Sequence, residues 1–96
     1  MNLNLVKLSC MLDEANIPYE WYSIYDEHDQ IIYPNRREWV SDVICHKYSY
    51  GHSCGLLEQM GLIPEERMNE IGDSVEGYLE PETVFERWRN HYYGNK

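Results

Sequence analysis

The chain combines a strong negative charge with an aromatic content that disordered acidic segments lack. It has 17 acidic and 8 basic residues among 96, a net charge of −9, together with nine tyrosines and three tryptophans. An acidic chain without apolar residues cannot bury enough surface to offset the entropy lost on folding, and these aromatic side chains supply that surface. We therefore expect a single folded acidic domain over residues 1–96. Tyrosine and tryptophan also commonly anchor protein interfaces.

Charge and cysteine content restrict the classes of function. Strong acidity argues against direct binding to nucleic acid or to an anionic membrane, because the phosphates would be repelled. No apolar run approaches the roughly 18 residues that span a bilayer, and residues 1–4 lack the features of a signal peptide. The cysteines form no paired framework (Cys10, Cys45 and Cys54). We expect free thiols in a reducing cytosol.

The N-terminal pattern predicts a helix with a defined end. Leucines at helical spacing indicate a helix over about residues 3–15, and Asn2 or Asn4 can cap its start. Asn16 then tolerates a left-handed cap, Ile17 can fold back on the last turn, and Pro18 stops the helix.

Three strands are expected next. Residues 19–25 are dense in aromatic side chains, residues 26–29 form a polar turn, and residues 30–33 return as the second strand of a hairpin. Residues 39–48 carry apolar side chains on both faces, which indicates a third strand that is central in the sheet or partly covered on both sides.

The C-terminal half predicts helices. Glycine and proline bracket short helices over residues 56–60 and 65–71, and a longer helix begins at residues 80–82. Its apolar face comprises Val84, Phe85, Trp88 and Tyr92. The element order predicts a two-layer α+β domain with an N-terminal helix, a three-stranded antiparallel sheet and C-terminal helices.

Residues 65–86 carry the strongest charge, with eight acids opposed only by Arg67. A solvated surface is one interpretation. The other is a surface that occupies the phosphate-binding sites of a basic protein. On the second interpretation, the carboxylates expected to bind a partner are Glu65, Glu66, Glu70, Asp73, Glu76 and Glu80.

The predicted hairpin holds an aromatic cluster of Tyr19, Trp21, Tyr22, Tyr25 and Tyr33. Alternate residues of a strand face opposite sides, so one set packs on the helices and the other faces outward. Cross-strand pairing within the sheet is one role for these rings. The other is a protein-binding face, to which we assign Tyr22, Tyr25 and Tyr33.

Two patterns resemble catalytic or metal sites. Residues 51–55 match the G-x-S-x-G nucleophile elbow, and Asp73 and His91 follow in hydrolase order, but that elbow needs a large parallel sheet. A plain turn is favoured instead. Soft metal ligands gather at Cys45, His46, His52 and Cys54. Because adjacent strand residues point to opposite faces, Cys45 and His46 do not both ligate easily. We expect no metal, no cofactor and no catalytic residue.

Three runs resemble small prophage-encoded proteins of Gram-positive bacteria, namely residues 12–20, 43–51 and 77–87. In size and acidity the chain is also similar to phage anti-CRISPR proteins. Its element order is similar to that of double-stranded-RNA-binding domains. Their basic residues are replaced here by Glu80, Glu82 and Glu86, which disfavours RNA binding.

The leading hypothesis is a non-enzymatic inhibitor in the cytoplasm of a bacterial host cell. Its partner would be a basic nucleic-acid-handling protein such as a Cas effector, bound through an acidic surface rich in tyrosine and tryptophan. The alternative is a self-associating phage accessory or structural module, a homodimer through the aromatic surface. A minor alternative is a small zinc or thiol/serine enzyme built on Cys45, His52, Ser53 and Cys54.

Overall fold

The structure, a computed structural model, describes residues 2–23, 29–45, 49, 55–68 and 74–94. These residues form two α-helices, five strands and one 3₁₀ helix. In chain order the elements are α1 (Leu3–Glu14), β1 (Glu20–Ser23), β2 (Asp29–Tyr33), β3 (Ser41–Cys45), β4 (Leu57–Met60), η2 (Glu65–Arg67), β5 (Val75–Leu79) and α2 (Pro81–Gly94). Among the described residues, no helix is long and apolar enough to cross a membrane.

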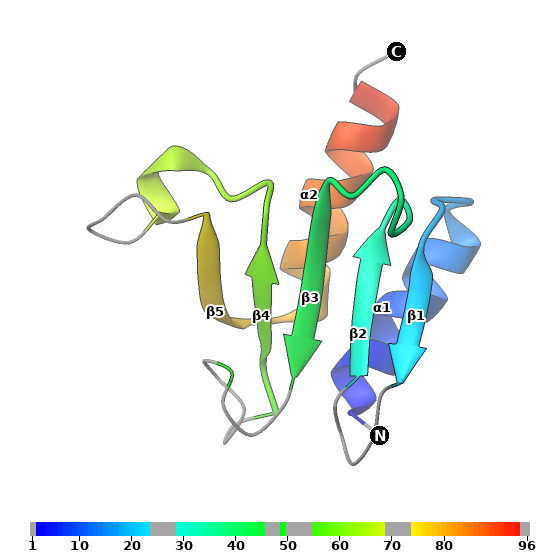
Figure 1. The fold of residues 1–96 in the computed structure, drawn as a ribbon, viewed down its shortest axis with the longest axis horizontal. Coiled ribbons are helices and arrows are strands. Elements are labelled where there is room, and N and C mark those ends of the chain that lie inside the picture. Colours follow the sequence, from blue (N-terminus) through cyan, green and yellow to red (C-terminus); the bar gives the residue numbers. More distant parts are fainter. Residues whose placement is uncertain (1, 24–28, 46–48, 50–54, 69–73, 95–96) are drawn as a thin grey trace.

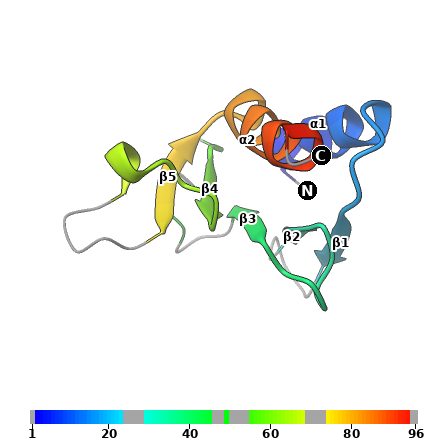
Figure 2. The same ribbon diagram turned by 90° about the horizontal axis from the view of Figure 1, so that it is seen from above.

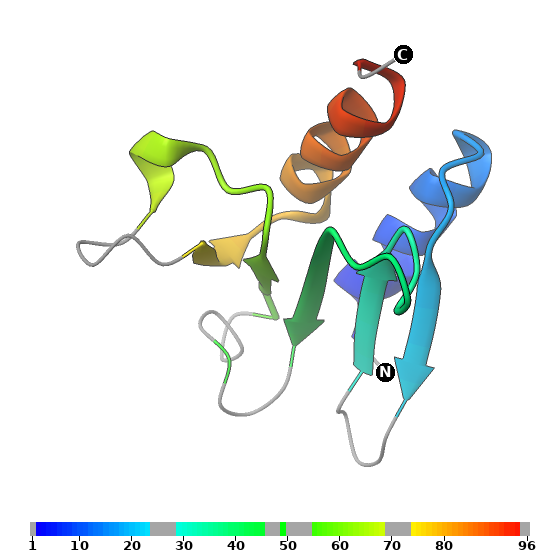
Figure 3. The same ribbon diagram turned by 45° about the horizontal axis from the view of Figure 1, so that its top comes forward.

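The five strands form one antiparallel meander in the order β1-β2-β3-β4-β5 (Figure 1). Both helices lie on the same face of this sheet (Figure 2). The connection over residues 34–40, between β2 and β3, lies on the side away from the helices (Figures 2 and 3). The two-layer α+β class is confirmed, and the opposite face of the sheet carries neither helix.

Helix α1 begins and ends as its sequence predicts. The Asn2 side chain accepts a hydrogen bond from the Leu5 N–H at 2.9 Å and so caps the start. At the other end Asn16 adopts a φ of 57°, while the Asn16 and Ile17 N–H groups donate to the Asp13 and Leu12 carbonyls. This left-handed cap folds Ile17 onto the core, where it is buried.

The two helices run side by side in the same direction. Lys7 near the start of α1 forms an ion pair with Glu82 near the start of α2, at 2.5 Å. At the other ends, the Tyr93 hydroxyl donates to the Ala15 carbonyl. Beneath them, buried leucines of α1 meet Val84 and Trp88 of α2 and the apolar side chains of the sheet.

The C-terminal half differs from its prediction. Residues 57–60 form strand β4 rather than a helix. Leu57 and Gln59 are two positions apart and both are buried, which is the alternation of a strand. Strand β5 was not predicted at all. Its register against β4 shifts by one residue between Leu57 and Gln59, so that Leu79 and Glu76 both face the helices although they are three positions apart. The sheet therefore has five strands instead of three, followed by a single α-helix.

A polar network joins α2 to the sheet. The Trp88 Nε1–H donates to the Ser41 hydroxyl at 2.9 Å, and Gln59 Nε2 donates to the Gly61 carbonyl at 2.8 Å. The Arg87 guanidinium links the Gln59 side-chain oxygen to the Glu76 carboxylate, with distances of 3.1 and 2.8 Å. Because every buried side-chain nitrogen or oxygen atom of the described residues has a hydrogen-bond partner, the network can lie inside the fold.

Candidate protein-binding surface

The face of the sheet away from the helices, called the open face below, carries a mixed set of apolar and charged side chains. Side chains of paired residues point to the same face, so strand register defines its members. One row runs across all five strands, and a second row runs across four of them. The members are Glu20, Ile32, Asp42, Met60 and Val75 in the first row, and Tyr22, Gln30, Ile44 and Glu58 in the second.

Two large apolar side chains stand exposed at this face. Trp39, at the end of the β2–β3 connection, is 44% exposed, and Met60 at the end of β4 is 45% exposed. The Trp39 indole is fixed on one side by a hydrogen bond from its Nε1–H to Asp42 Oδ2, at 2.7 Å. Met60 is the cross-strand partner of the same Asp42. Exposed Trp and Met side chains of this kind are typical of protein interfaces.

Gly61 makes room for the Trp39 ring. It has a φ of 80°, and a β-carbon there would lie 2.4 Å from the Val40 carbonyl oxygen and 3.2 Å from Cη2 of Trp39. Only glycine adopts this backbone conformation without strain and leaves this space open.

Replacement of Gly61 with alanine should therefore lower the free energy of unfolding by about 2 kcal/mol. Urea denaturation measures this effect, and Gly94→Ala is the control, since a β-carbon at Gly94 meets no atom within 4 Å. A Gly61→Ala protein as stable as the parent would contradict the described backbone conformation of Gly61 and its close approach to the Val40 carbonyl.

A second aromatic group lies at the β1 edge of the open face. The Tyr22 hydroxyl donates to Glu20 Oε1 at 3.2 Å, and the Arg36 guanidinium lies 5.9 Å from the centre of the Tyr22 ring. The backbone N–H of Arg36 also donates to Glu20 Oε1, at 2.6 Å. A hollow of about 320 Å³ lies between these groups, lined by Tyr22, Gln30, Ile32 and Arg36. The hollow gives the open face a concave part beside its exposed apolar side chains.

The Asp42 carboxylate is held partly buried on the open face. Burial raises its pKa above the ordinary 3.8, and the nearby negative charge of Glu58 adds to this, while hydrogen bonds from Trp39 and Gln30 lower it. The net shift is upward. The charged form of Asp42 therefore opposes folding.

This leads to a pH-dependent expectation for Asp42→Asn. A raised pKa in the folded state contributes stability that is present below pH 3.8 and is lost as the pH rises through the raised value. The asparagine variant retains an acceptor for Trp39 and carries no charge, so at pH 7 it should melt at a higher temperature than the parent. Thermal unfolding followed by circular dichroism from pH 7 to pH 4 should show this advantage narrowing as the pH falls. A variant less stable than the parent at pH 7 would contradict the assignment.

Most of the residues predicted to bind a partner lie apart from one another. Tyr22 is on the open face of β1, at one edge of the sheet. Glu65 and Glu66 are exposed on η2, and Glu80 is exposed just before α2, all beside the opposite edge strand β5. Their role in binding stays a prediction. Glu70, Asp73 and Tyr25 lie outside the described residues.

Two predicted binding residues serve the fold instead. Tyr33 is buried, because it shares the helix-facing side of β2 with Ile31, and its ring stacks on Trp88 at 5.3 Å between centres. Its hydroxyl meets Nδ1 of His91 at 2.6 Å. The Glu76 side chain is only 9% exposed and pairs with Arg67 at 2.6 Å and Arg87 at 2.8 Å. The prediction of surface roles for Tyr33 and Glu76 is therefore wrong.

The residues suggested for metal binding or catalysis give no assembled site in the described part of the chain. Cys45 is buried and accepts a hydrogen bond from the Asn2 amide at 3.2 Å, and His91 contacts Tyr33. Among the described residues, no cluster of three His, Cys, Asp or Glu side chains could hold a metal ion. His46, His52, Ser53, Cys54 and Asp73 lie outside those residues.

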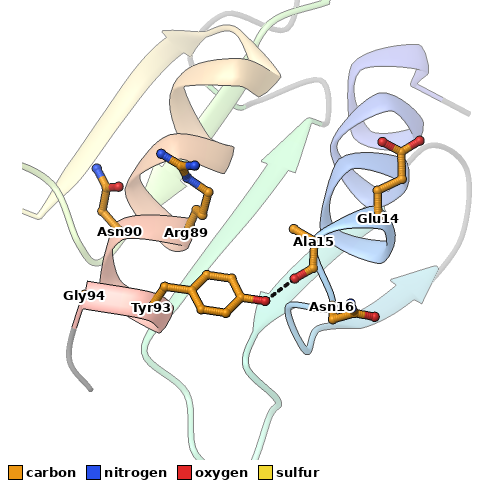
Figure 4. Close-up of a pocket in the computed structure, with 7 residues that line it drawn as sticks. All are labelled: Glu14, Ala15, Asn16, Arg89, Asn90, Tyr93 and Gly94. Atoms are coloured by element: carbon orange, nitrogen blue, oxygen red, sulfur yellow. Dashed lines mark hydrogen bonds between the residues drawn. The ribbon is translucent and has the colours of Figure 1, made fainter.

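A polar hollow of about 830 Å³ lies between the C-terminal ends of α1 and α2 (Figure 4). The Tyr93 ring crosses from α2 toward α1, where its hydroxyl donates to the Ala15 carbonyl (Figure 4). Polar side chains at the rim include Glu14, Asn16, Arg89 and Asn90. Tyr93 thus links the C-terminal ends of the two helices. The residues that line the hollow form no assembled set of reactive groups.

Trp39, Asp42, Ile44 and Met60 were not predicted as site residues. Trp39 and Asp42 meet because the chain turns from a loop into β3, and Met60 joins them because residues 57–60 are a strand. The alternation of Asp42 and Ile44 with the buried Val43 and Cys45 was the available signal for the open face. No protein-family model, curated protein or solved structure matches this chain. Its function is therefore inferred from the open face and its chemistry.

Proposed function

We propose that this chain is a non-enzymatic binding protein whose open face docks on a basic protein. The observation that carries the proposal is the exposure of Trp39 and Met60 around the Asp42 carboxylate, on the sheet face opposite helices α1 and α2. Exposed aromatic and Met side chains supply apolar contact area, and a surrounding charged rim sets which partner fits.

The charge of the open face favours a basic partner. It carries three carboxylates, on Glu20, Asp42 and Glu58, and the neighbouring loop contributes the guanidinium of Arg36. The chain as a whole carries a charge of −9. Such a surface attracts a positively charged protein and speeds its association, while it repels nucleic acid.

The most specific form of the proposal is an inhibitor of a nucleic-acid-handling protein in a bacterial cytosol, such as a Cas effector. Such effectors hold nucleic acid in a positively charged channel and read a short DNA motif with arginines. Carboxylates beside aromatic rings offer those arginines an alternative ligand. The exposed Glu65, Glu66 and Glu80 would extend the attraction from the other edge of the sheet.

A symmetric homodimer through the open face is less favoured. It would bring the carboxylates of Asp42 and Glu58 in one copy against the same patch of the second copy. Like charges facing one another across an interface oppose association. Light scattering tests this directly, and a stable dimer that dissociates on Trp39→Ala would overturn the proposal of a basic partner.

The proposal is tested by affinity capture from a bacterial lysate with matched variants. Trp39→Ala/Met60→Ala removes two exposed side chains from the open face, and Leu3→Ala/Tyr93→Ala removes two from the helices. The parent and the helix variant should retain the same basic nucleic-acid-handling protein, whose capture weakens with salt, and the open-face variant should lose it. Equal capture by all three proteins, or loss in the helix variant alone, would contradict the proposal.

A further inference from the structure

The open face repeats one chemical arrangement, an aromatic ring beside a carboxylate. In the first instance the ring is Tyr22 and the carboxylate is Glu20, joined by the tyrosine hydroxyl at 3.2 Å. The chain itself supplies a cation to this pair, since the Arg36 guanidinium lies 5.9 Å from the ring centre. Its backbone N–H also donates to Glu20. The first pair is thus a closed unit of ring, carboxylate and arginine.

The second instance lacks the arginine. Here the ring is Trp39 and the carboxylate is Asp42, joined by the indole N–H at 2.7 Å. In the described part of the chain, Asp42 forms no salt bridge and no cation lies over the Trp39 ring. Among the described residues, the charged group that acts on Asp42 is Glu58, which has the same sign.

We propose that Trp39 and Asp42 form a receptor for an arginine side chain of the partner protein. The inference rests on the proposed function, because it names the group that the open face recognises. The guanidinium would stack on the exposed side of the indole and donate hydrogen bonds to the Asp42 carboxylate oxygens.

The receptor is rigid before the partner arrives. The Trp39 ring is held at its Nε1–H by Asp42 and lies beside Gly61, where a β-carbon would come within 3.2 Å of the ring. Asp42 sits in the middle strand of the sheet, between β2 and β4. Little side-chain freedom is lost on binding, which favours affinity.

Arginine fits better than lysine for two reasons. Its guanidinium is planar and stacks on an indole, and it donates two parallel hydrogen bonds to one carboxylate. It is also less strongly hydrated than an ammonium group, so it enters a partly buried position at a lower cost. Partial burial raises the pKa of Asp42, and an arriving arginine would offset the cost of burying its negative charge.

The test is a nuclear magnetic resonance titration with three blocked tripeptides, glycine–X–glycine, in which X is arginine, lysine or citrulline. Citrulline has nearly the shape of arginine without its charge. The indole N–H signals report the site, because Trp39 is on the open face while the indoles of Trp21 and Trp88 bond to Ser23 and Ser41. The indole N–H signals of Trp21 and Trp88 are therefore internal controls.

The arginine peptide should shift the Trp39 signal saturably at millimolar concentration, and the lysine peptide should bind at least about threefold more weakly. Citrulline should produce no saturable shift. Asp42→Asn should weaken arginine binding at least about tenfold, whereas Leu3→Ala, on helix α1 away from the open face, should leave it unchanged. Equal binding of arginine and citrulline, shifts of all three indoles together, or full binding to Asp42→Asn would overturn the inference.

Failure of this inference and failure of the proposed function give different results. If the open-face variant loses its captured protein but the arginine peptide does not bind, the inference of an arginine receptor is contradicted and the proposed docking on the open face is supported. If the arginine peptide binds at Trp39 but capture of the partner protein does not depend on the open face, the inference of an arginine receptor is supported and the proposed function is contradicted.

Discussion

Replacement of Trp88 with alanine should lower the free energy of unfolding by about 3–5 kcal/mol, the usual cost of removing a buried aromatic side chain. Trp88 is fully buried in α2 and stacks on Tyr33, with 5.3 Å between ring centres. It also donates from Nε1 to the Ser41 hydroxyl at 2.9 Å. Its loss would leave a cavity between the helices and the sheet and would remove a buried hydrogen bond.

Urea denaturation followed by circular dichroism measures this loss. Trp39→Ala is the control, because Trp39 is 44% exposed and its removal should cost about 1 kcal/mol or less. If the variant cannot be purified in a folded form, Trp88→Phe should be folded and measurably less stable than the parent. Equal stability losses at Trp88 and Trp39 would contradict the described packing.

Reversal of the Asp42 charge should abolish partner binding. Truncation of one member of a buried charge pair costs on the order of 2–5 kcal/mol, and Asp42→Arg adds repulsion against an incoming arginine. We expect the affinity for the captured protein to fall at least about 100-fold. Asp42 is at the centre of the open face, between the hydrogen-bonded Trp39 and the cross-strand Met60.

Glu66→Arg is the matched control for this reversal, because Glu66 is exposed on η2, away from Asp42. It changes net charge by the same amount, so it should weaken binding only several-fold through long-range attraction. Isothermal titration at two salt concentrations, with circular dichroism to verify folding, separates the two variants. A larger loss for Glu66→Arg than for Asp42→Arg would identify the acidic segment of residues 65–86 as the binding surface.

The sequence was most informative where local rules dominate. Helix α1 was predicted to its last turn, because the leucine spacing and the Asn16-Ile17-Pro18 cap act within a few residues of each other. Strands β1 to β3 and helix α2 begin within two residues of their predicted starts, although β3 was predicted over residues 39–48 and is observed over Ser41–Cys45. Strand β4 was mistaken for a helix because four residues are too few to separate a period of two from one of 3.6.

Features that depend on the pairing of segments far apart in the chain could not be predicted from the sequence. Strand β5 contains a glycine and a shifted register, so its inward residues Glu76 and Leu79 do not alternate. Which aromatic residues face outward depends on the register between β1 and β2, because a shift of one residue would move every side chain to the other face. The observed register places Tyr22 on the open face and Tyr33 in the core. The Trp39–Asp42 contact depends on how the loop enters β3, which no spacing rule describes.

The central claim, that the open face binds a basic protein, is tested most directly by oxidative footprinting of the complex with the captured protein. Hydroxyl radicals modify exposed Trp, Met and Tyr side chains, and Trp39, Met60 and Tyr93 are 44%, 45% and 43% exposed in the free chain. We expect the partner to slow the oxidation of Trp39 and Met60 and to leave Tyr93 on the helical side unchanged. Slower oxidation of Tyr93, with Trp39 and Met60 reacting as in the free protein, would contradict the claim.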